Sequence, residues 1–339
     1  MRVVHLIPYD GIGGVERAAR TMGSMTWKTV SSSVETIFPR PSAAKRFVLG
    51  NPFFFGRSIF RIFRNPPEIL IVSLWRAYLV GIIVKVLRPS IRLIVFLHYP
   101  NDVHFADRHA TRLAARLAEQ VWADSHETLN RRVPSHFSKE ARVISFVTER
   151  FSPVPTQPVN PSFVFWGRIH SQKGIDRALR IFYEIRNRCT DAQFWIIGPD
   201  GGDLSRLSEL CKDLEIDHSV QFLGPMDVNK IKQIAGKASF YLQTSTLEGM
   251  AMSVVEGMQF GLVPIVTPVG EIGNYCEHLR NAVVIDKDED AVNDVMALLN
   301  NNQQFQTLRK NAIETWLDRP LYRDDIANAC MELLKDRLQ

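Results

Sequence analysis

The chain has 339 residues, 45% of them hydrophobic and 23% charged, a composition typical of a globular protein large enough for two domains. Its four cysteines are scattered without a Cys-x-x-Cys pair, which argues against disulfides and a zinc site and favours a reducing compartment. Residues 1–150 carry 22 basic and 11 acidic side chains, whereas the remainder carries 19 and 25. The basic first half predicts an anionic partner such as nucleic acid, phospholipid or a phosphorylated acceptor.

Two apolar stretches bear on membrane insertion. The N-terminal "MRVVHLIPYDGIGG" is too short for a signal peptide and enters a glycine turn. The most apolar later window, Tyr78–Pro89, is interrupted by Lys85 and is shorter than a membrane span. We therefore expect a protein that is not integral to a membrane.

In residues 1–150, short apolar runs alternate with helical patterns. Strands are predicted at Arg2–Tyr9, Val34–Arg40, Glu68–Leu74, Arg92–His98, Gln120–Ser125 and Ala141–Phe146. The clearest helix is "DRHATRLAARLAEQ", whose apolar residues recur at three- and four-residue spacing. Uninterrupted apolar strands between helices predict a parallel sheet covered on both faces.

A proline-rich stretch separates this half from a second run of the same pattern. Residues 151–162, "FSPVPTQPVNPS", hold four prolines and are predicted to be an interdomain linker. Beyond it, strands are predicted at Phe163–Gly167, Ala192–Gly198, Val220–Gly224, Ala238–Thr244, Leu262–Thr267 and Ala282–Asp286. The sequence therefore predicts two Rossmann-like doubly wound α/β domains, residues 1–150 and 163–319, facing a central cleft. A last helix within residues 320–339 is expected to cross back onto the first domain.

A glycine turn follows the first predicted strand. "YDGIGGVERAAR" places Gly11, Gly13 and Gly14 at the start of a helix, where a phosphate can approach backbone N–H groups. The spacing lacks the third glycine of a dinucleotide fingerprint, and no acidic residue obviously follows the second strand. A nicotinamide enzyme is therefore disfavoured, while a purely structural turn stays open.

Two cations follow the first strand of the second domain. "FWGRIHSQKGIDRAL" puts Arg168 and Lys173 in the loop at the end of that strand, facing the expected cleft. An arginine fork and a lysine point charge together suit a diphosphate. On these residues alone, a solvated basic loop is an equally good interpretation.

Two acids lie in a later loop and the helix after it. "FYLQTSTLEGMAMSVVEGMQFGLVPIV" follows the order strand, loop, helix, strand, with Glu248 in the loop and Glu256 about one turn into the helix. The helix start offers backbone N–H groups to a phosphate. Acids at this spacing are weak evidence by themselves, but their combination with Arg168 and Lys173, in this order and after strand ends, favours two hydroxyl-binding carboxylates beside a phosphate site.

At these motifs the sequence resembles the GT-B glycosyltransferases, specifically glycosyltransferase family 4. "GRIHSQKG" is similar to the family's G-R-x(4)-K-G element, "EGMAMSVVE" to its E-x(7)-E element, and "VWADSHETL" to the segment that closes its first domain. "LHYPND" places a histidine where the family keeps one near the transferring sugar. The resemblance implies a retaining enzyme that uses a nucleotide-diphosphate sugar.

The resemblance also implies roles for individual residues. Arg168 and Lys173 would bind the donor diphosphate, Glu248 the donor-sugar hydroxyls and Glu256 the ribose. His98 would be an orienting contact beside the sugar, and Gly13 and Gly14 would line the phosphate and acceptor side. The catalytic set is thus His98, Arg168, Lys173 and Glu248, and the donor site is completed by Gly249, Met250, Ala251, Met252 and Ser253. The chain departs from the family pattern at Ala251, where glycine is usual, and in "EHLRNAVVID", which lacks the usual glycine before the last strand.

The segment Lys45–Arg64 matches nothing in the family pattern. "KRFVLGNPFFFGRSIFRIFR" alternates cations with phenylalanines and has no acid, which suits an interfacial segment among anionic headgroups. The alternatives are an ordinary helix packed on the domain and, more weakly, a site for single-stranded nucleic acid. The expected membrane or acceptor contacts are Lys45, Arg46, Arg57, Arg61 and Arg64.

Together these features predict a peripheral enzyme on the cytoplasmic face of a membrane. We expect a hexosyltransferase that moves a sugar from a UDP- or GDP-sugar to a lipid-linked acceptor or a cell-surface polysaccharide or lipopolysaccharide, without a metal or a nucleic-acid partner. No Asp-x-Asp-like pair is positioned to hold a metal on a diphosphate. A GT-B sugar-nucleotide epimerase, a phosphorylase and a non-catalytic partner subunit stay open.

Overall fold

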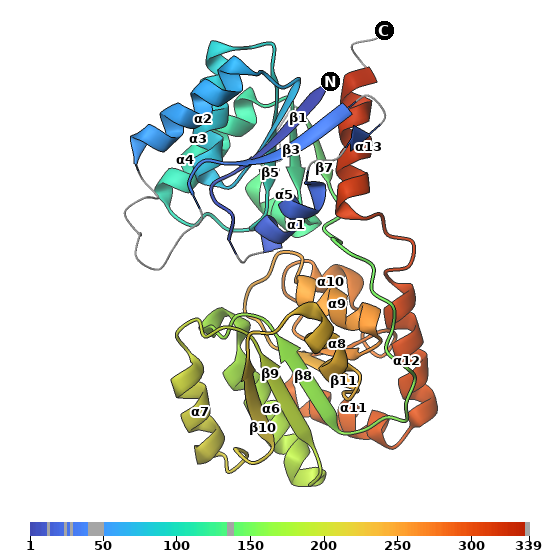
Figure 1. Cartoon of the computed structure of the whole chain (residues 1–339). Coiled ribbons are helices and arrows are strands. Elements are labelled where there is room, and N and C mark those ends of the chain that lie inside the picture. The colour runs from blue at the N-terminus through green and yellow to red at the C-terminus, as the bar shows by residue number, and fades with distance from the viewer. Residues whose placement is uncertain (12–13, 24–25, 28–29, 40–50, 134–138, 336–339) are drawn as a thin grey trace. The chain divides into compact units, whose positions relative to one another are not determined.

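The computed structural model describes residues 1–11, 14–23, 26–27, 30–39, 51–133 and 139–335 (Figure 1). The chain folds into two compact units. The first combines Met1–Glu149 with the chain from Pro320 onward, and the second is Arg150–Arg319. Each unit is an α/β layered structure built around its own sheet.

Seven strands form the sheet of the first unit, in the order β2-β3-β1-β4-β5-β6-β7. All pair in parallel except β2, which is antiparallel to β3. The long apolar strands are buried because helices cover the sheet, which confirms the predicted parallel architecture. The strands are β1 (Arg2–Ile7), β2 (Thr26–Trp27), β3 (Val30–Thr36), β4 (Ile69–Ser73), β5 (Arg92–Leu97), β6 (Gln120–Ala123) and β7 (Glu140–Val143).

The second strand was expected at Val34–Arg40, and this position is wrong by about four residues. Strand β3 begins at Val30 and runs through three serines, which pair with β1 from Ser31 opposite Arg2 onward. Serines carry no apolar signal, so the pattern pointed to the later run instead. The pairing with β1 depends on backbone hydrogen bonds, which any residue but proline supplies.

Three helices of the first unit lie side by side on its sheet, α2 (Pro52–Arg64), α3 (Trp75–Leu87) and α4 (Phe105–Leu117) (Figure 1). Helix α3 packs against both α2 and α4. Asn51 caps the start of α2, because its side chain accepts a hydrogen bond from the N–H of Phe53 at 3.0 Å. The other helices of the unit are α1 (Gly14–Met22), α5 (His126–Arg132) and α13 (Tyr322–Lys335).

Helix α13, at the end of the chain, packs on the first unit against α1. Its anchor is Tyr322, whose N–H donates to the carbonyl of Val147 at 2.8 Å. The Tyr322 ring stacks on Phe96 at 6.0 Å between centroids and meets Phe146 edge-on at 5.5 Å. The hydroxyl is buried without a hydrogen-bond partner, and burial raises the pKa of Tyr322 well above its usual value.

The second unit has a six-stranded parallel sheet in the order β10-β9-β8-β11-β12-β13. Its strands are β8 (Ser162–Trp166), β9 (Gln193–Ile197), β10 (Val220–Gly224), β11 (Phe240–Gln243), β12 (Val263–Val266) and β13 (Val283–Val284). Its helices are the 3₁₀ turn η2 (Ser171–Lys173), α6 (Ile175–Arg188), α7 (Leu204–Asp213), α8 (Val228–Ala235), α9 (Met252–Phe260), α10 (Ile272–Tyr275), α11 (Asp288–Leu299) and α12 (Asn302–Glu314).

The proline-rich segment at residues 151–161 has neither helix nor strand and lies along the second unit. Val154 is buried there, and its N–H donates to the carbonyl of Phe260 at 2.9 Å. Arg309 on α12 donates to the side chain of Thr156 at 3.2 Å. In the part of the chain that the structure describes, no helix is both long and apolar enough to cross a bilayer.

The buried, unpaired hydroxyl of Tyr322 generates a stability prediction. We expect Tyr322→Phe to keep or raise the melting temperature of the protein, because it removes a polar group that is buried without a partner. Tyr322→Ala should destabilise the first unit by about 3–5 kcal/mol, because it leaves a cavity against Phe96 and Phe146. Calorimetry of the three proteins checks both outcomes, and a Tyr322→Phe protein as unstable as Tyr322→Ala would contradict this account.

Candidate functional site

The residues predicted to bind a nucleotide sugar lie on two adjoining loops of the second unit. Strands β8 and β11 are paired in parallel, so the loops that follow them emerge next to each other at the carboxyl edge of the sheet. Arg168 and Lys173 follow β8, and Glu248 follows β11 just before α9. The topology therefore brings the basic pair and the acidic motif to one edge.

Backbone hydrogen bonds join the two loops. Gly174 has a φ of +60°, and a Cβ at this position would lie 2.1 Å from the carbonyl oxygen of Thr244, so only glycine fits. The Thr244 hydroxyl donates to the carbonyl of Gly174 at 2.6 Å. The N–H of Thr246 donates to the carbonyl of Gln172 at 2.9 Å, and the Gln172 amide donates to the carbonyl of Leu247 at 2.7 Å.

This close approach places Lys173 against Glu248. The Lys173 Nζ lies 2.7 Å from Glu248 Oε1, and the two side chains are only 18% and 8% exposed. The side-chain amide of Gln243 donates to the same carboxylate oxygen at 3.1 Å. The lysine balances the charge of the buried carboxylate, and the amide adds a hydrogen bond to it. The charge of Lys173 is therefore already neutralised within the unit.

The orientation of the Gln243 amide is set by two hydroxyl groups. Tyr241 and Ser253 donate to Gln243 Oε1 at 2.8 and 3.0 Å, which turns the amide nitrogen toward Glu248. Burial raises the pKa of Tyr241 well above its usual value, so its hydroxyl stays protonated and donates. Tyr241 and Gln243 were not predicted, because they belong to no motif and only their alternate positions in β11 indicate a shared face.

Arg168 differs from Lys173 because its charge is uncompensated. The side chain is exposed and makes no ion pair with any residue that the structure describes. Its stem passes over Gly201, where a Cβ would lie 2.8 Å from Arg168 Cγ. The glycine-rich "GPDGGD" that follows β9 is the sequence signal for this close approach.

The start of α9 provides the N–H groups that were predicted to meet a phosphate. Met252 and Ser253 are the first residues of the helix, and N–H groups at this position have no acceptor within a helix. Ala251 precedes them with a φ of +55° and is buried. An alanine in the left-handed region costs roughly 1–2 kcal/mol relative to a right-handed one, which explains why glycine is favoured here.

A third loop, after β12, holds the backbone of the acidic motif. Gly270 has a φ of +59°, and a Cβ on it would lie 2.2 Å from the carbonyl oxygen of Glu248. The N–H of Glu271 donates to the carbonyl of Gly249 at 2.9 Å, and the Tyr275 hydroxyl donates to the carbonyl of Met250 at 3.0 Å. The segment from Glu248 to Met250 is thus fixed by its carbonyl groups.

Glu256, predicted to hold a ribose, is buried inside α9. Its Oε2 accepts a hydrogen bond from Nε1 of Trp166, the last residue of β8, at 2.9 Å. Glu256 is only 4% exposed. The carboxylate therefore connects α9 to β8, and Trp166 is a further site residue that the sequence did not reveal.

The site residues predicted in the first unit form a different environment. Gly13 lies outside the described residues, and Gly14 is the exposed first residue of α1. His98 follows β5 with its side chain only 1% exposed. Its Nε2 lies 2.8 Å from the hydroxyl of Ser73, which in turn lies 2.8 Å from Nε2 of His5.

The proton arrangement in this buried chain follows from its neighbours. His98 Nδ1 lies 3.8 Å from the carboxylate of Asp124, which favours a proton on Nδ1. His98 Nε2 then accepts from Ser73, and Ser73 accepts from His5. Burial lowers the pKa of His98 well below 6.5 and that of His5 to about 3, so both rings are neutral at pH 7.

The predicted membrane contacts divide into three groups. Lys45 and Arg46 lie outside the described residues. Arg57 and Arg64 are exposed on α2. Arg61 was expected among them; its side chain is 40% exposed, and its guanidinium donates to the carbonyl of Thr36 at 2.8 Å and to the hydroxyl of Ser58 at 3.2 Å. These bonds tie α2 to the end of β3, and a membrane contact of Arg61 stays a prediction.

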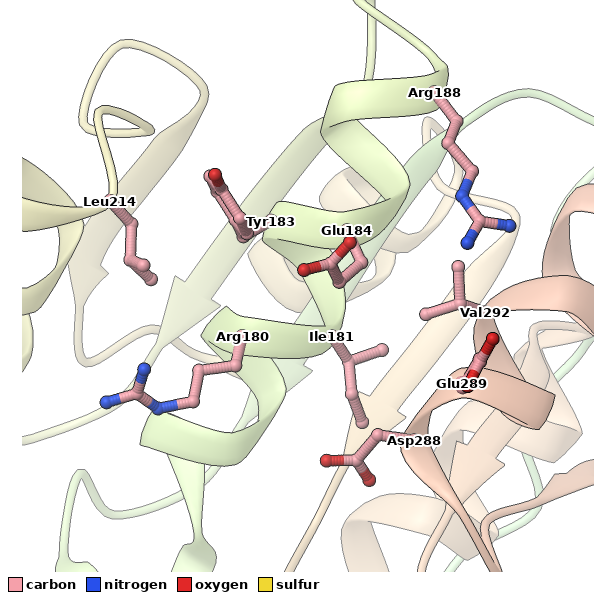
Figure 2. Close-up of a pocket in the computed structure, with 9 residues that line it drawn as sticks. All are labelled: Arg180, Ile181, Tyr183, Glu184, Arg188, Leu214, Asp288, Glu289 and Val292. Atoms are coloured by element: carbon pink, nitrogen blue, oxygen red, sulfur yellow. The ribbon is translucent and has the colours of Figure 1, made fainter.

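A pocket of about 500 Å³ lies elsewhere on the second unit, between α6 and α11 (Figure 2). Figure 2 shows acidic and basic side chains mixed around it. None of the predicted donor-binding residues lines it. Its lining residues are Arg180, Ile181, Tyr183, Glu184, Arg188, Leu214, Asp288, Glu289 and Val292. Among the described residues, no group of three or more His, Cys, Asp or Glu side chains is placed to hold a metal ion.

Residues 148–315 match the protein family described as "Glycosyl transferases group 1". A glycogen synthase from Exiguobacterium sibiricum is 26% identical over 179 residues, 53% of this chain and 35% of the relative. The GPI3 subunit of a phosphatidylinositol N-acetylglucosaminyltransferase from Saccharomyces cerevisiae is 25% identical over 149 residues, 44% of this chain and 32% of the relative. The chain thus spans about a third of the length of these curated relatives.

Among solved structures, HepE from Anabaena in complex with UDP is similar over 99% of this chain and 100% of that chain, with a TM-score of 0.79 and 16% identity. The same protein is also known in complex with UDP-glucose. The likeness confirms the GT-B fold of two Rossmann-like domains. The family match covers nearly all of the second unit, and Arg168, Lys173, Glu248 and Glu256 all lie within the matched residues.

The left-handed backbone at Ala251 generates a second prediction. We expect Ala251→Gly to stabilise the second unit by up to about 1 kcal/mol, because the relief of strain exceeds the entropy that glycine adds to the unfolded chain. Ala251→Val should destabilise it, because a β-branched residue is least tolerant of a positive φ. Urea unfolding of the three proteins measures both effects, and a less stable Ala251→Gly protein would contradict the assigned backbone conformation.

The buried histidines generate a third prediction, on pH dependence. Below pH 6.5 the unfolded chain binds a proton at His5 that the folded protein does not bind until about pH 3. Stability should therefore fall as the pH is lowered from 6.5 to 5, at about 1.4 kcal/mol per pH unit for each such histidine. His5→Gln should reduce this slope by about 1.4 kcal/mol per pH unit, the contribution of one bound proton. His109→Gln, at an exposed position, should leave the slope unchanged. Urea unfolding at three pH values gives the slopes, and an unchanged slope for His5→Gln would refute the assignment.

Proposed function

We propose that this protein is a retaining glycosyltransferase that moves a hexose from a nucleotide-diphosphate sugar, with UDP-sugars as the first donors to test. The observation that carries the proposal is the group 1 family match together with the adjoining loops inside it, which combine the uncompensated charge of Arg168, the Lys173–Glu248 pair and the open start of α9. The UDP and UDP-glucose complexes of the structurally similar HepE support this choice of donor.

The site suits a diphosphate leaving group. When the bond between the sugar and the diphosphate breaks, negative charge develops on the departing phosphate oxygens. Arg168 supplies a bidentate donor for that charge, and the N–H groups of Met252 and Ser253 supply the positive end of a helix. Such preorganised donors stabilise the transition state without rearrangement during the reaction. We propose that these groups replace a metal ion.

The carboxylates near the site have other partners. Glu248 is bound by Lys173 and Gln243, and Glu256 by Trp166, so neither is a free nucleophile for double displacement. We therefore propose front-face attack, in which the acceptor hydroxyl bonds to the anomeric carbon as the diphosphate leaves, and a phosphate oxygen takes the hydroxyl proton. His98 is neutral, and its role as an orienting contact stays a prediction.

For the acceptor, we propose a lipid-linked or surface glycan on the cytoplasmic face of a membrane. The basic composition of residues 1–150 supports a phosphorylated or membrane-borne acceptor. One curated relative is named for glycosyl transfer to phosphatidylinositol, which has a lipid acceptor of this kind.

A binding experiment tests the donor site. We expect Arg168→Ala to weaken UDP binding about 10–100-fold, because it removes charge-assisted hydrogen bonds, and to leave stability unchanged, because the side chain is exposed. Lys173→Ala alone would leave the buried carboxylate of Glu248 without a positive partner. The matched test for Lys173 is therefore Lys173→Ala combined with Glu248→Gln. Arg180→Ala, at an exposed position on α6, is the control.

Isothermal calorimetry with UDP and GDP, followed by product analysis with UDP-glucose, gives the result. Unchanged UDP affinity of Arg168→Ala would overturn the diphosphate site. Release of UDP with transfer of the sugar supports the proposed reaction, whereas an isomerised nucleotide sugar identifies an epimerase.

A further inference from the structure

The outward face of α3 is apolar from Leu79 to Leu87, and Arg76, one turn earlier, lies on the same side of the helix. Its outer residues are spaced three and four apart, so they form one stripe along the helix: Leu79, Ile82, Ile83, Val86 and Leu87. Ile83, Val86 and Leu87 are 40%, 60% and 63% exposed. Lys85 lies off this stripe, because its Nζ donates to the carbonyls of Pro89 and Ile91, each at 2.8 Å. A contiguous exposed apolar stripe of this kind marks an interaction surface.

The helices on either side of α3 expose both apolar and cationic side chains. Helix α2 exposes Phe53 at 67% and Phe60 at 65%, while its other phenylalanines pack on the core. Helix α4 exposes Phe105 at 78% and Leu113 at 47%. Between these side chains lie exposed arginines of both helices: Arg57, Arg64, Arg108, Arg112 and Arg116.

The three helices themselves expose no acidic side chain, and the exposed Asp102 just before α4 lies 3.8 Å from Arg108. The sequences of α2, α3 and α4 hold eight lysines and arginines and a single acid, Asp107. Asp107 is buried and lies 3.2 Å from Arg132 of α5. The exposed residues of α2, α3 and α4 therefore form an apolar centre with a cationic margin, here called the three-helix face.

We propose that the three-helix face docks on the surface of a bilayer that contains anionic lipids. Phenylalanine, valine and leucine side chains enter the boundary between headgroups and acyl chains, while the arginines at the margin bind lipid phosphates. A second copy of the chain is a poorer occupant, because two cationic margins would face each other and repel. Nucleic acid would leave the apolar stripe of α3 without a partner.

The face is continuous with the edge of the sheet that carries His98. Helices α3 and α4 begin shortly after β4 and β5, so their first residues lie at the carboxyl edge of the first sheet. Phe105, at the start of α4, extends the apolar surface to this edge. A lipid-borne molecule held at the bilayer surface would therefore meet the first unit there. This inference is independent of sugar transfer, and it is tested without a donor.

The test uses the full chain and sedimentation with vesicles of phosphatidylcholine, alone or with phosphatidylglycerol. We expect binding to the mixed vesicles that weakens with salt, and little binding to phosphatidylcholine alone. The margin variant carries Arg57→Glu, Arg64→Glu and Arg112→Glu. Because each cation near an anionic surface contributes about 1 kcal/mol, the variant should bind about 100-fold more weakly. A control with Arg180→Glu, Lys212→Glu and Lys230→Glu makes the same charge change at exposed positions of the second unit and should bind as the wild type does.

A second variant tests the apolar centre. Val86→Asp with Leu87→Asp should abolish vesicle binding with little loss of stability, because both side chains are more than half exposed. Circular dichroism checks the fold, and sedimentation velocity gives the oligomeric state. The proposal is overturned if the margin variant binds as well as its control. It is also overturned if the centre variant still binds vesicles while converting a dimer into a monomer, since the face would then be a contact between copies.

Discussion

The candidate site depends on one contact, the approach of Gly174 to the carbonyl of Thr244. This approach needs a left-handed residue without a Cβ, and it allows the loop after β8 to lie directly on the loop after β11. Lys173 precedes that glycine, so the same contact sets the 2.7 Å pair with Glu248. The glycine of the Lys-Gly motif is thus a packing requirement, and the lysine is positioned by it.

Both departures from the family pattern fall at or beside strained backbone. Ala251, where glycine is usual, has a φ of +55°, and Leu279, in the segment that lacks the usual glycine, also has a φ of +55°. An L-residue in the left-handed region carries a steric cost that glycine does not. This protein therefore accepts backbone strain at Ala251 and at Leu279, within or beside the segments that depart from the family pattern.

The sequence was sufficient for the sheet architecture and for the loops that carry the site. Continuous apolar strands indicate parallel sheets, and residues that follow neighbouring strands meet at one edge. It was insufficient where a long-range contact decides. The serines at the start of β3 give no apolar signal, so the sequence pattern did not mark that start. The position of the Arg61 guanidinium depends on the carbonyl of Thr36. The hydrogen bond between Trp166 and Glu256 joins residues 90 positions apart. None of these partners is visible in local composition.

The two cations of the donor motif are not equivalent, and the difference bears on how a donor would bind. Arg168 is uncompensated, so a diphosphate adds an attraction that the free protein lacks. Lys173 is already neutralised by Glu248, so a diphosphate gains from Lys173 only by sharing it with that carboxylate. As Lys173 turns toward phosphate, an oxygen of Glu248 loses its strongest partner and gains capacity to accept hydrogen bonds from sugar hydroxyls. On the proposed function, binding of the diphosphate and recognition of the sugar are therefore coupled through one ion pair, whereas Arg168 acts on the diphosphate alone.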